Sequence, residues 1–369
     1  MFANPFARFQ DAPVVLDGAM ASELERRGCD LNDALWSARV LIEQPELIRQ
    51  VHFDYFAAGA DGATTASYQA SFSGFAKRGL DEAAATELMQ RSVQLAQQAR
   101  DEFWADAANH AGRQKPLVAA SVGPYGAMLA DGSEYRGDYG RSETELMDFH
   151  RLRIAALLAA APDLLACETI PCAVEARAIA RVLQQDFPQA TAWISFSCRD
   201  GANLSDGTPL LAAVAELEAY PQIVAVGVNC TAPRHIVPLL QTLAASTGKR
   251  LLTYPNSGEA YDAVTKTWHG RSDPMAFAEA ARQWRLAGAS CIGGCCRTSP
   301  DDIRALAGWL RGSIGIPTIA LRRPAGRLFH CLYCSSGPAA SRLPSAINSR
   351  PMPRLSHSCT PSRRWRKPS

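Results

Sequence analysis

Three cysteines, in two motifs that each follow an apolar run, are the residues of this sequence best suited to chemistry. Cys230 closes a Gly-Val-Asn-Cys motif, and Cys295 and Cys296 close a Gly-Gly-Cys-Cys motif 65 residues further along the chain. Both apolar runs are typical of buried strands, so the motifs are expected at strand ends. Three thiolates at one place match a zinc site that keeps its fourth position open for a substrate.

The two adjacent cysteines require a turn in the chain. Neighbouring residues of a strand point to opposite faces, so Cys295 and Cys296 reach one point only after the strand has ended, and the glycines before them permit that turn. A disulfide between these neighbours would be strained, and nothing in the sequence indicates an oxidising compartment. Packing is the alternative role for any free cysteine. We expect it for the isolated ones, which are Cys29, Cys167, Cys172, Cys198 and Cys291.

The elements that must position the three thiols alternate along residues 12–311. Short apolar runs recur eight times: Val14–Leu16, Gly62–Ala66, Leu117–Ser121, Leu164–Cys167, Ala192–Phe196, Ile223–Val228, Arg250–Tyr254 and Ala289–Ile292. Helical patterns fill the gaps between them. In one gap four apolar residues share a helix face, namely Leu88, Leu95, Ala99 and Phe103. Three helix-start signals agree: Ser142 with Glu145, Asp273 before Pro274, and Ser299 before Pro300.

This alternation predicts an α/β fold of the (β/α)8 TIM-barrel type. A doubly wound open sheet is the competing architecture. It would normally carry a Gly-rich phosphate loop after the first strand, and Asp17-Gly18-Ala19-Met20 is not GxGxxG. In a barrel, reactive residues follow the strands on the carboxyl-terminal face. We therefore expect the zinc site at the carboxyl-terminal ends of the strands.

The net charge of +2 averages two unlike regions. Residues 312–369 hold ten Lys or Arg and no acidic residue, whereas residues 1–311 hold 28 basic and 36 acidic residues. The mildly acidic body has no basic stripe for nucleic acid. Its richest apolar stretch, Ile154–Cys167, is interrupted by Pro162 and is too short to span a bilayer. With no signal-peptide pattern at the start, we expect a cytoplasmic protein that keeps its thiols reduced.

The segment 312–369 is expected to be a basic Ser/Pro/Arg-rich tail, separate from a barrel domain that spans 1–311. Its ten Ser and eight Pro, with little apolar periodicity, predict disorder. Cys331 and Cys334 form a CxxC pair, but the second pair of a zinc knuckle is missing. The abrupt loss of acidic residues favours translation in a shifted reading frame. A solvated appendage and a contact with RNA or anionic lipid are the alternatives.

Beyond these patterns, the chain resembles the homocysteine S-methyltransferase family, and within it the branch that uses S-methylmethionine. The resemblance covers nearly all of residues 12–311. It is carried by the segments 16–20 (LDGAM), 64–70 (TTASYQA), 121–127 (SVGPYGA), 129–137 (LADGSEYRG), 168–171 (ETIP), 227–230 (GVNC) and 293–298 (GGCCRT). The cysteine motifs are specific for the family, whereas GPYGA and DGSEYRG resemble the S-methylmethionine branch. The tail has no counterpart in the family pattern.

The resemblance implies a barrel enzyme that transfers a methyl group from S-methylmethionine, or from S-adenosylmethionine, to homocysteine and so makes methionine, a step of amino-acid biosynthesis. Zn²⁺ and the homocysteine sulfur would be held by Cys230, Cys295 and Cys296. Asp17 and Glu168 match the family's acidic residues near the substrate amino group, the backbone of Gly18 and Ala19 would lie near its carboxylate, and Asn229 would support the metal loop. Further substrate-binding residues expected after strands are Tyr68, Gln69 and Asn256.

The chemistry of these residues is coherent. A free thiol has a pKa of about 8.5 and is mostly protonated at neutral pH, whereas a zinc-bound thiol is deprotonated. A sulfonium donor leaves as a neutral thioether, so no general acid is needed, in keeping with the lack of a convincing catalytic histidine. The cationic donor favours aromatic faces and an acidic surrounding. Loop 123–139, with Asp131 or Glu134, is the expected donor side.

Other functions fit parts of the sequence. The same barrel could use another donor, betaine or a corrinoid partner, although no cobalamin-binding segment is recognisable. A non-catalytic zinc- or thiol-binding protein would need a fourth cysteine or histidine beside the three. A metal-free lyase would need a lysine at a strand end, and Lys266 is the nearest candidate without lying at one. The preferred donor and the oligomeric state do not follow from the sequence.

Truncation after Arg311 tests the domain assignment. If the tail is a frame-shifted appendage, the shortened protein keeps the melting temperature and the rate of methionine formation of the full chain, because the tail contributes neither core nor site. Both quantities are compared on the two purified proteins. A loss of either on truncation would contradict the assignment.

Overall fold

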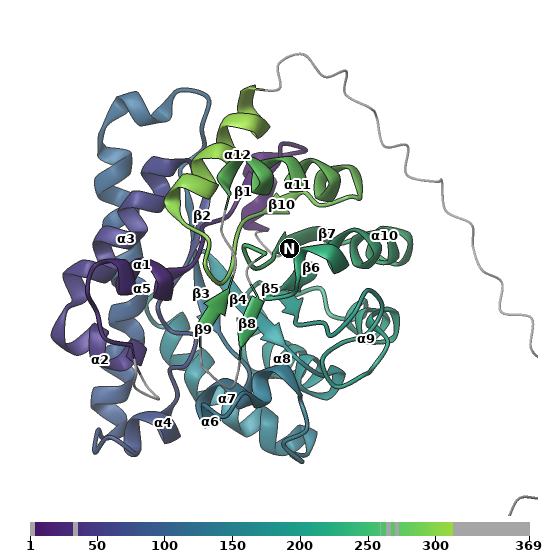
Figure 1. Ribbon diagram of the computed structural model, residues 1–369. Helices are drawn as coiled ribbons and strands as arrows, with labels where there is room; N and C mark the ends of the chain where they lie inside the picture. The colour runs from purple at the N-terminus through teal and green to yellow at the C-terminus, as the bar shows by residue number, and fades with distance from the viewer. Residues whose placement is uncertain (1–3, 32–35, 259, 263–266, 270–272, 313–369) are drawn as a thin grey trace, which may run out of the picture. The chain divides into compact units, whose positions relative to one another are not determined.

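Parallel strands form the centre of the molecule, and helices surround them (Figure 1). The computed structural model describes residues 4–31, 36–258, 260–262, 267–269 and 273–312, so the predicted tail lies outside the described residues but for Gly312. The barrel strands are β1 (Val14–Val15), β2 (Gly62–Thr64), β3 (Leu117–Val122), β4 (Leu164–Ile170), β5 (Ala192–Phe196), β6 (Ile223–Asn229), β7 (Arg250–Tyr254) and β10 (Cys291–Ile292).

The strand order confirms the predicted barrel. Neighbours run β1-β10-β7-β6-β5-β4-β3-β2, and every pair is parallel. A single parallel bridge between Leu16 and Gly62 joins the two ends of this series. The sheet therefore closes on itself, which the doubly wound alternative would not do.

Each barrel strand is followed by at least one helix before the next barrel strand begins. The α-helices are α1 (Met20–Arg26), α2 (Trp36–Glu43), α3 (Pro45–Ala58), α4 (Phe72–Ala76), α5 (Glu82–Ala105), α6 (Tyr125–Leu129), α7 (Glu143–Leu158), α8 (Ala173–Asp186), α9 (Leu210–Leu217), α10 (Ile236–Ser246), α11 (Pro274–Leu286) and α12 (Pro300–Gly312). Short 3₁₀ turns are η1 (Pro5–Phe9), η2 (Ala107–His110), η3 (Ser133–Tyr135) and η4 (Pro233–His235).

The period-two pattern of each strand builds two apolar layers. On β3, Leu117 and Ala119 point into the barrel, and Val118 and Ala120 belong to the layer beneath the helices. Strands of this kind are buried on both faces and appear in the sequence as continuous apolar runs. Their positions could therefore be predicted from the sequence. Trp193 is the largest of the inward-facing side chains.

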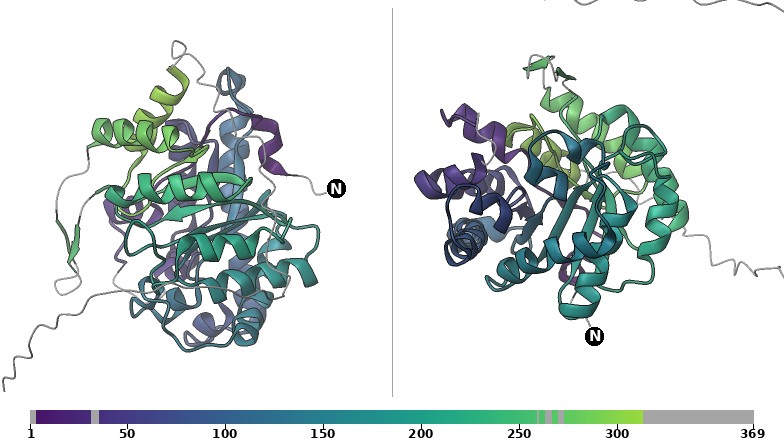
Figure 2. Two further views of the ribbon diagram at one scale, coloured as in Figure 1. Left: turned by 90° about the vertical axis from the view of Figure 1, so that its right-hand side faces the viewer. Right: turned by 90° about the horizontal axis from the view of Figure 1, so that it is seen from below.

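The amino-terminal turn η1 closes one end of the barrel. Its Phe6 and Phe9 are buried among the inward-facing residues, and Phe6 lies 6.2 Å from the ring of Trp193. Sequence analysis did not foresee this turn. At the opposite end of the molecule lies a hairpin of β8 (Ala260–Asp262) and β9 (Thr267–His269), inserted between β7 and α11 (Figure 2).

The helix-start signals are confirmed. Ser142 and Glu145 form a reciprocal capping box at α7, and the Asp273 carboxylate accepts hydrogen bonds from two N–H groups at the start of α11. α12 begins at Pro300, after Ser299. The four apolar residues predicted to share a helix face are all buried on α5.

One strand boundary differs from the prediction in a way that affects the site. β4 continues past Cys167 to Ile170, so Glu168 lies within the strand rather than after it. Thr169 has a positive φ of 61°, and the register with β5 shifts between Cys167 and Ile170. This irregularity is a local bulge, which can re-aim a side chain at a barrel rim.

Two further expectations concern membranes and the isolated cysteines. Over the part of the chain that the structure describes, no helix combines the length and apolar character needed to cross a bilayer. The five isolated cysteines predicted to pack are all buried with free thiols.

Candidate metal centre

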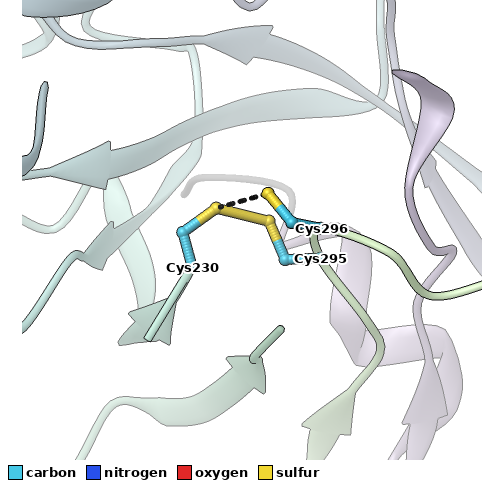
Figure 3. A group of neighbouring side chains, drawn as sticks. All are labelled: Cys230, Cys295 and Cys296. Carbon is cyan, nitrogen blue, oxygen red and sulfur yellow. Dashed lines mark hydrogen bonds between the residues drawn. A yellow bond between two sulfur atoms is a disulfide. The ribbon is translucent and has the colours of Figure 1, made fainter. Parts of the chain in front are cut away.

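The three cysteines named first in the sequence meet at the carboxyl-terminal ends of β6 and β10 (Figure 3). Their sulfur atoms all lie within 4.8 Å of one another, and the Sγ atoms of Cys230 and Cys296 are 3.9 Å apart. Cys230 and Cys295 are joined as a disulfide. Among the described residues these three are the only group of His, Cys, Asp or Glu arranged to hold a metal ion.

A turn after β10 brings the adjacent cysteines to one point, as the sequence required. The strand ends at Ile292, and Gly293 and Gly294 follow. A Cβ at Gly293 would lie 2.6 Å from that of Leu16, and one at Gly294 would lie 2.4 Å from Thr298 Oγ1. Only glycine fits this close approach of the chain to the first strand.

Both cysteine loops are tied to the end of β7. The Cys230 N–H donates to the Tyr254 carbonyl at 3.3 Å, and the Cys295 N–H donates to the Pro255 carbonyl at 2.8 Å. Cys230 itself has a φ of 45°, in the left-handed region that costs a non-glycine residue free energy. The backbone thus holds the thiols in place independently of any ion.

The thiols fit a tetrahedral metal ion once reduced. A zinc–sulfur distance of about 2.3 Å implies sulfur atoms about 3.8 Å apart, close to the 3.9 Å between Cys230 and Cys296. The disulfide uses two of the three sulfurs, so disulfide and metal exclude each other. Sequence analysis had weighed only a disulfide between the two adjacent cysteines. Burial raises the pKa of the Cys296 thiol to about 11, so without an ion this thiol is protonated.

Two buried carboxylates, Asp17 and Glu168, lie near each other on the same face. Burial raises the pKa of Asp17 well above its usual range, and the charge of Glu168 adds to the effect. Burial likewise raises the pKa of Glu168 to about 7. Within the described residues neither carboxylate has an ion pair with a lysine or arginine. A cationic ligand group would supply the missing partner.

A hydrogen-bond network fixes the Glu168 carboxylate. The Ser121 hydroxyl donates to its Oε1, and the Tyr254 hydroxyl is a second partner. The same Tyr254 oxygen accepts from Trp193 Nε1 at 3.1 Å and lies 2.6 Å from Ser195 Oγ. All of these residues are buried. Sequence analysis did not identify Trp193 or Ser195 as parts of the site, because each reads as an ordinary core residue of a strand.

Asn229 lies directly before Cys230 and reaches across to the bulge of β4. Its Oδ1 accepts from the Thr169 N–H and its Nδ2 donates to Thr169 Oγ1, each at 2.8 Å. Thr169 in turn is a hydrogen-bond partner of the Tyr68 hydroxyl. Both amide atoms of Asn229 are thereby engaged, so this residue links the metal loop to the strand that carries Glu168.

The other predicted substrate-binding residues line the same end of the barrel. Gly18 and Ala19 precede α1, and the Ala19 N–H donates to Thr298 Oγ1 at 3.2 Å. Gln69 follows β2 and Asn256 follows β7. The side-chain oxygens of Gln69 and Asn256 are buried and accept no hydrogen bond from the described residues. These acceptors are available to a ligand's donor groups.

A buried arginine that sequence reasoning missed holds two of the loops together. Arg153 on α7 is 1% exposed and donates to the carbonyls of Gly123, Ser67 and Tyr68 at 2.8, 3.3 and 3.0 Å. Burial lowers the pKa of its guanidinium to about 10. Its position on a helix with an unremarkable pattern gave no signal of this role.

Two of the histidines make contacts with neighbouring side chains outside the metal centre. His150 is buried against Glu175, and His110 stacks on Trp104, in keeping with structural roles. Trp268 lies on β9, where side chains are outside the described part. Lys266, the nearest lysine candidate for a lyase, lies outside the described residues altogether.

Comparisons with known proteins agree with this geometry. The chain matches the family described as Homocysteine S-methyltransferase over residues 14–310. It is 57% identical to the homocysteine S-methyltransferase YbgG of Bacillus subtilis, over 84% of this chain and 98% of the relative. The crystal structure of the metallated form of the homocysteine methyltransferase MmuM from Escherichia coli is 52% identical, covers 83% of this chain and 99% of its own, and has a TM-score of 0.74. The oxidised form of the same protein has a TM-score of 0.75, with 51% identity, and covers 82% of this chain and 99% of its own.

Removal of one thiol tests the metal centre. In Cys296→Ala, one of three ligands is lost, so we expect the reduced protein to bind less than a tenth of the metal bound by the wild type, since even outer-shell changes cost about 10- to 100-fold in affinity. Metal content is measured by atomic absorption after dialysis with reductant. Cys291→Ala, at a buried free thiol on β10, the strand that leads to Cys295 and Cys296, is the matched control and should keep its metal. Equal metal in both variants would exclude the three-cysteine site.

Proposed function

The chain belongs to the homocysteine S-methyltransferase family, and we propose that it transfers a methyl group from S-methylmethionine, with S-adenosylmethionine as a second donor, to the sulfur of homocysteine. Methionine is the product. The observation that carries this proposal is the convergence of three thiols beside two buried carboxylates that have no cationic partner among the described residues. A thiol substrate with an ammonium group fits both features.

We assign Zn²⁺ to the centre, held by Cys230, Cys295 and Cys296. The set of three sulfur ligands and the sulfur spacing support zinc over ions that prefer oxygen. When bound, zinc would lower the pKa of the homocysteine thiol and keep its sulfur nucleophilic. The three cysteines serve as ligands only when reduced, and this requirement favours a cytoplasmic location.

The protein's own residues orient the amino acid. We propose that Asp17 and Glu168 hold the homocysteine ammonium, with Ser121 and Tyr254 fixing the second carboxylate. The backbone at Gly18 and Ala19 lies beside Asp17 and would face the substrate carboxylate. Gln69 and Asn256 offer buried acceptors for remaining donor groups. Such positioning lowers the entropic cost of bringing the two substrates together.

Zinc content measured together with product formation tests the proposed function. The reduced protein should hold about one zinc per chain, as a single set of three ligands implies. It should form methionine from homocysteine and S-methylmethionine, more slowly from S-adenosylmethionine, and not from betaine. Activity with betaine alone would overturn the donor, and zinc without turnover from any donor would favour a non-catalytic thiol-binding protein.

The pH dependence of homocysteine binding tests the role of Glu168. Only the ionised carboxylate pairs with an ammonium, and the pKa of Glu168 is about 7. The value of kcat/KM for homocysteine should therefore rise from pH 6 to pH 8. In Glu168→Gln this rise should flatten and KM increase by about 10- to 100-fold, the size of a charge-assisted hydrogen bond.

The control for this measurement is Asp138→Asn, which removes an exposed carboxylate outside the site and should leave the profile unchanged. Zinc content is measured in both variants. An unaltered pH profile in Glu168→Gln would contradict the ammonium contact, whereas zinc loss in that variant would indicate a structural role.

A further inference from the structure

A carboxylate oxygen without a partner is buried on the η3 turn. Oε2 of Glu134 is shielded from water and accepts no hydrogen bond from the described residues. Burial raises the pKa of this carboxyl, and the charge of Asp131 adds to the effect. Arg136, whose charge lowers the pKa of Glu134, is directed to Asp131 and Asp138, at 3.9 and 3.3 Å. A buried anion in this state is costly unless a ligand compensates it.

Two tyrosines, Tyr68 and Tyr135, and the metal-site Cys296 lie close enough to Glu134 for its charge to add to burial in raising the pKa of each. After burial, the Glu134 charge is the main reason why the pKa of Tyr68 is raised. The hydroxyl of Tyr135 is a hydrogen-bond partner of Cys296, although 47% of the residue is exposed, so this ring stands at the mouth with its polar end turned inward. A carboxylate and two tyrosines therefore lie beside the metal centre.

Close backbone contacts fix the positions of Glu134 and Tyr68. Gly126 on α6 packs against η3 so closely that a Cβ there would lie 2.5 Å from the Glu134 nitrogen. The Ser197 hydroxyl, after β5, donates to the Glu134 carbonyl at 3.3 Å. On the other side, Arg153 holds the Tyr68 carbonyl. Two of these contacts fix the backbone that carries the Glu134 carboxylate, and the third fixes Tyr68, before any ligand arrives.

We propose that Glu134, together with the nearby Tyr68 and Tyr135, is the subsite for the sulfonium centre of the methyl donor. This inference rests on the proposed function. The homocysteine sulfur lies at the three cysteines, and the donor methyl must touch it for transfer to occur. Groups that adjoin Cys296 therefore meet the sulfonium end of the donor. Aromatic faces and a carboxylate are what a sulfonium cation, which donates no N–H or O–H hydrogen bond, interacts with best.

The transfer step gives this carboxylate a distinctive kinetic effect. The thiolate sulfur forms a bond to the methyl carbon while the carbon–sulfonium bond breaks, and its electron pair stays on the departing neutral thioether. Positive charge on the donor therefore declines toward the transition state. Glu134 stabilises the bound cation more than the transition state, so it lowers the donor KM without raising kcat.

Glu134→Gln, in the full-length zinc-loaded protein, tests this subsite. We expect KM for S-methylmethionine to rise about tenfold, which is the effect of about 1.4 kcal/mol, while kcat stays equal or increases. KM for homocysteine and zinc content should not change. Calorimetric titration of S-methylmethionine without homocysteine, where no turnover occurs, should give the same loss of affinity.

An uncharged analogue separates charge from shape. In 2-amino-5-methylhexanoate a CH group replaces the sulfonium, and the ammonium and carboxylate of the donor remain. Its inhibition constant should be the same for wild type and Glu134→Gln. Equal weakening of the analogue and of the sulfonium would overturn the inference, because Glu134 would then hold the loop or the donor ammonium.

Asp131, the other carboxylate expected on the donor side from the sequence, is 55% exposed and pairs with Arg136, so the structure favours Glu134 over it. Asp131→Asn is therefore the matched control, because it removes the same charge from the same loop. Its donor KM should remain that of the wild type. An equal rise of the donor KM in both variants would overturn the subsite, because the donor would then respond to the total negative charge of the loop rather than to Glu134. Wild-type activity with an unchanged donor KM in Glu134→Gln would overturn this inference alone. A wild type that forms no methionine would overturn the proposed function, and this inference with it.

Discussion

The three thiols of the metal centre can meet because β7 lies between the two strands that carry them. Ionised thiols repel one another, so their convergence must be enforced by the chain. The end of β7 accepts hydrogen bonds from the backbone of both cysteine loops, through the carbonyls of Tyr254 and Pro255. The same Tyr254 reaches into the barrel and holds Glu168. The end of β7 therefore sets the positions of the metal-binding cysteines and of the Glu168 carboxylate together.

The charges of the site are complementary to what it is proposed to bind. Its functional groups are thiols, carboxylates and amide oxygens, and the buried Arg153 is engaged by three carbonyls. Zinc, an ammonium and a sulfonium are all cations. Buried acceptors without partners cost stability in the empty protein, and each ligand that binds relieves part of that cost. Ligand binding should therefore stabilise the fold.

The parts of the site that sequence predicted are those marked by residue type and period. Cysteine is rare and reactive, and the strands before Cys230 and Cys295 are buried on both faces, so both the thiols and their positions could be inferred. The capping box at Ser142 depends on local sequence alone and was equally accessible. These features need no knowledge of distant contacts.

The parts that sequence could not supply depend on long-range packing. Arg153 donates hydrogen bonds to backbone carbonyls that are 30 and 86 residues away in the sequence. No side chain in the sequence marks those carbonyls as its partners. The bulge that places Glu168 within β4 is set by Asn229 on another strand. The disulfide pairs Cys230 with Cys295 rather than two neighbours, which only the fold determines. The hairpin after β7 has too few residues for a strand pattern to emerge.

The closed amino-terminal end of the barrel has a consequence for how ligands enter and leave the site. In the part of the chain that the structure describes, Phe6 and Phe9 fill the amino-terminal end of the barrel, so a ligand of Asp17 and Glu168 would enter from the carboxyl-terminal rim. If homocysteine and the donor both enter there, the molecule nearer the rim would block the other. A donor that binds first would then keep homocysteine out. Excess donor would then inhibit the reaction, because Phe6 and Phe9 close the amino-terminal end of the barrel to a second route of entry.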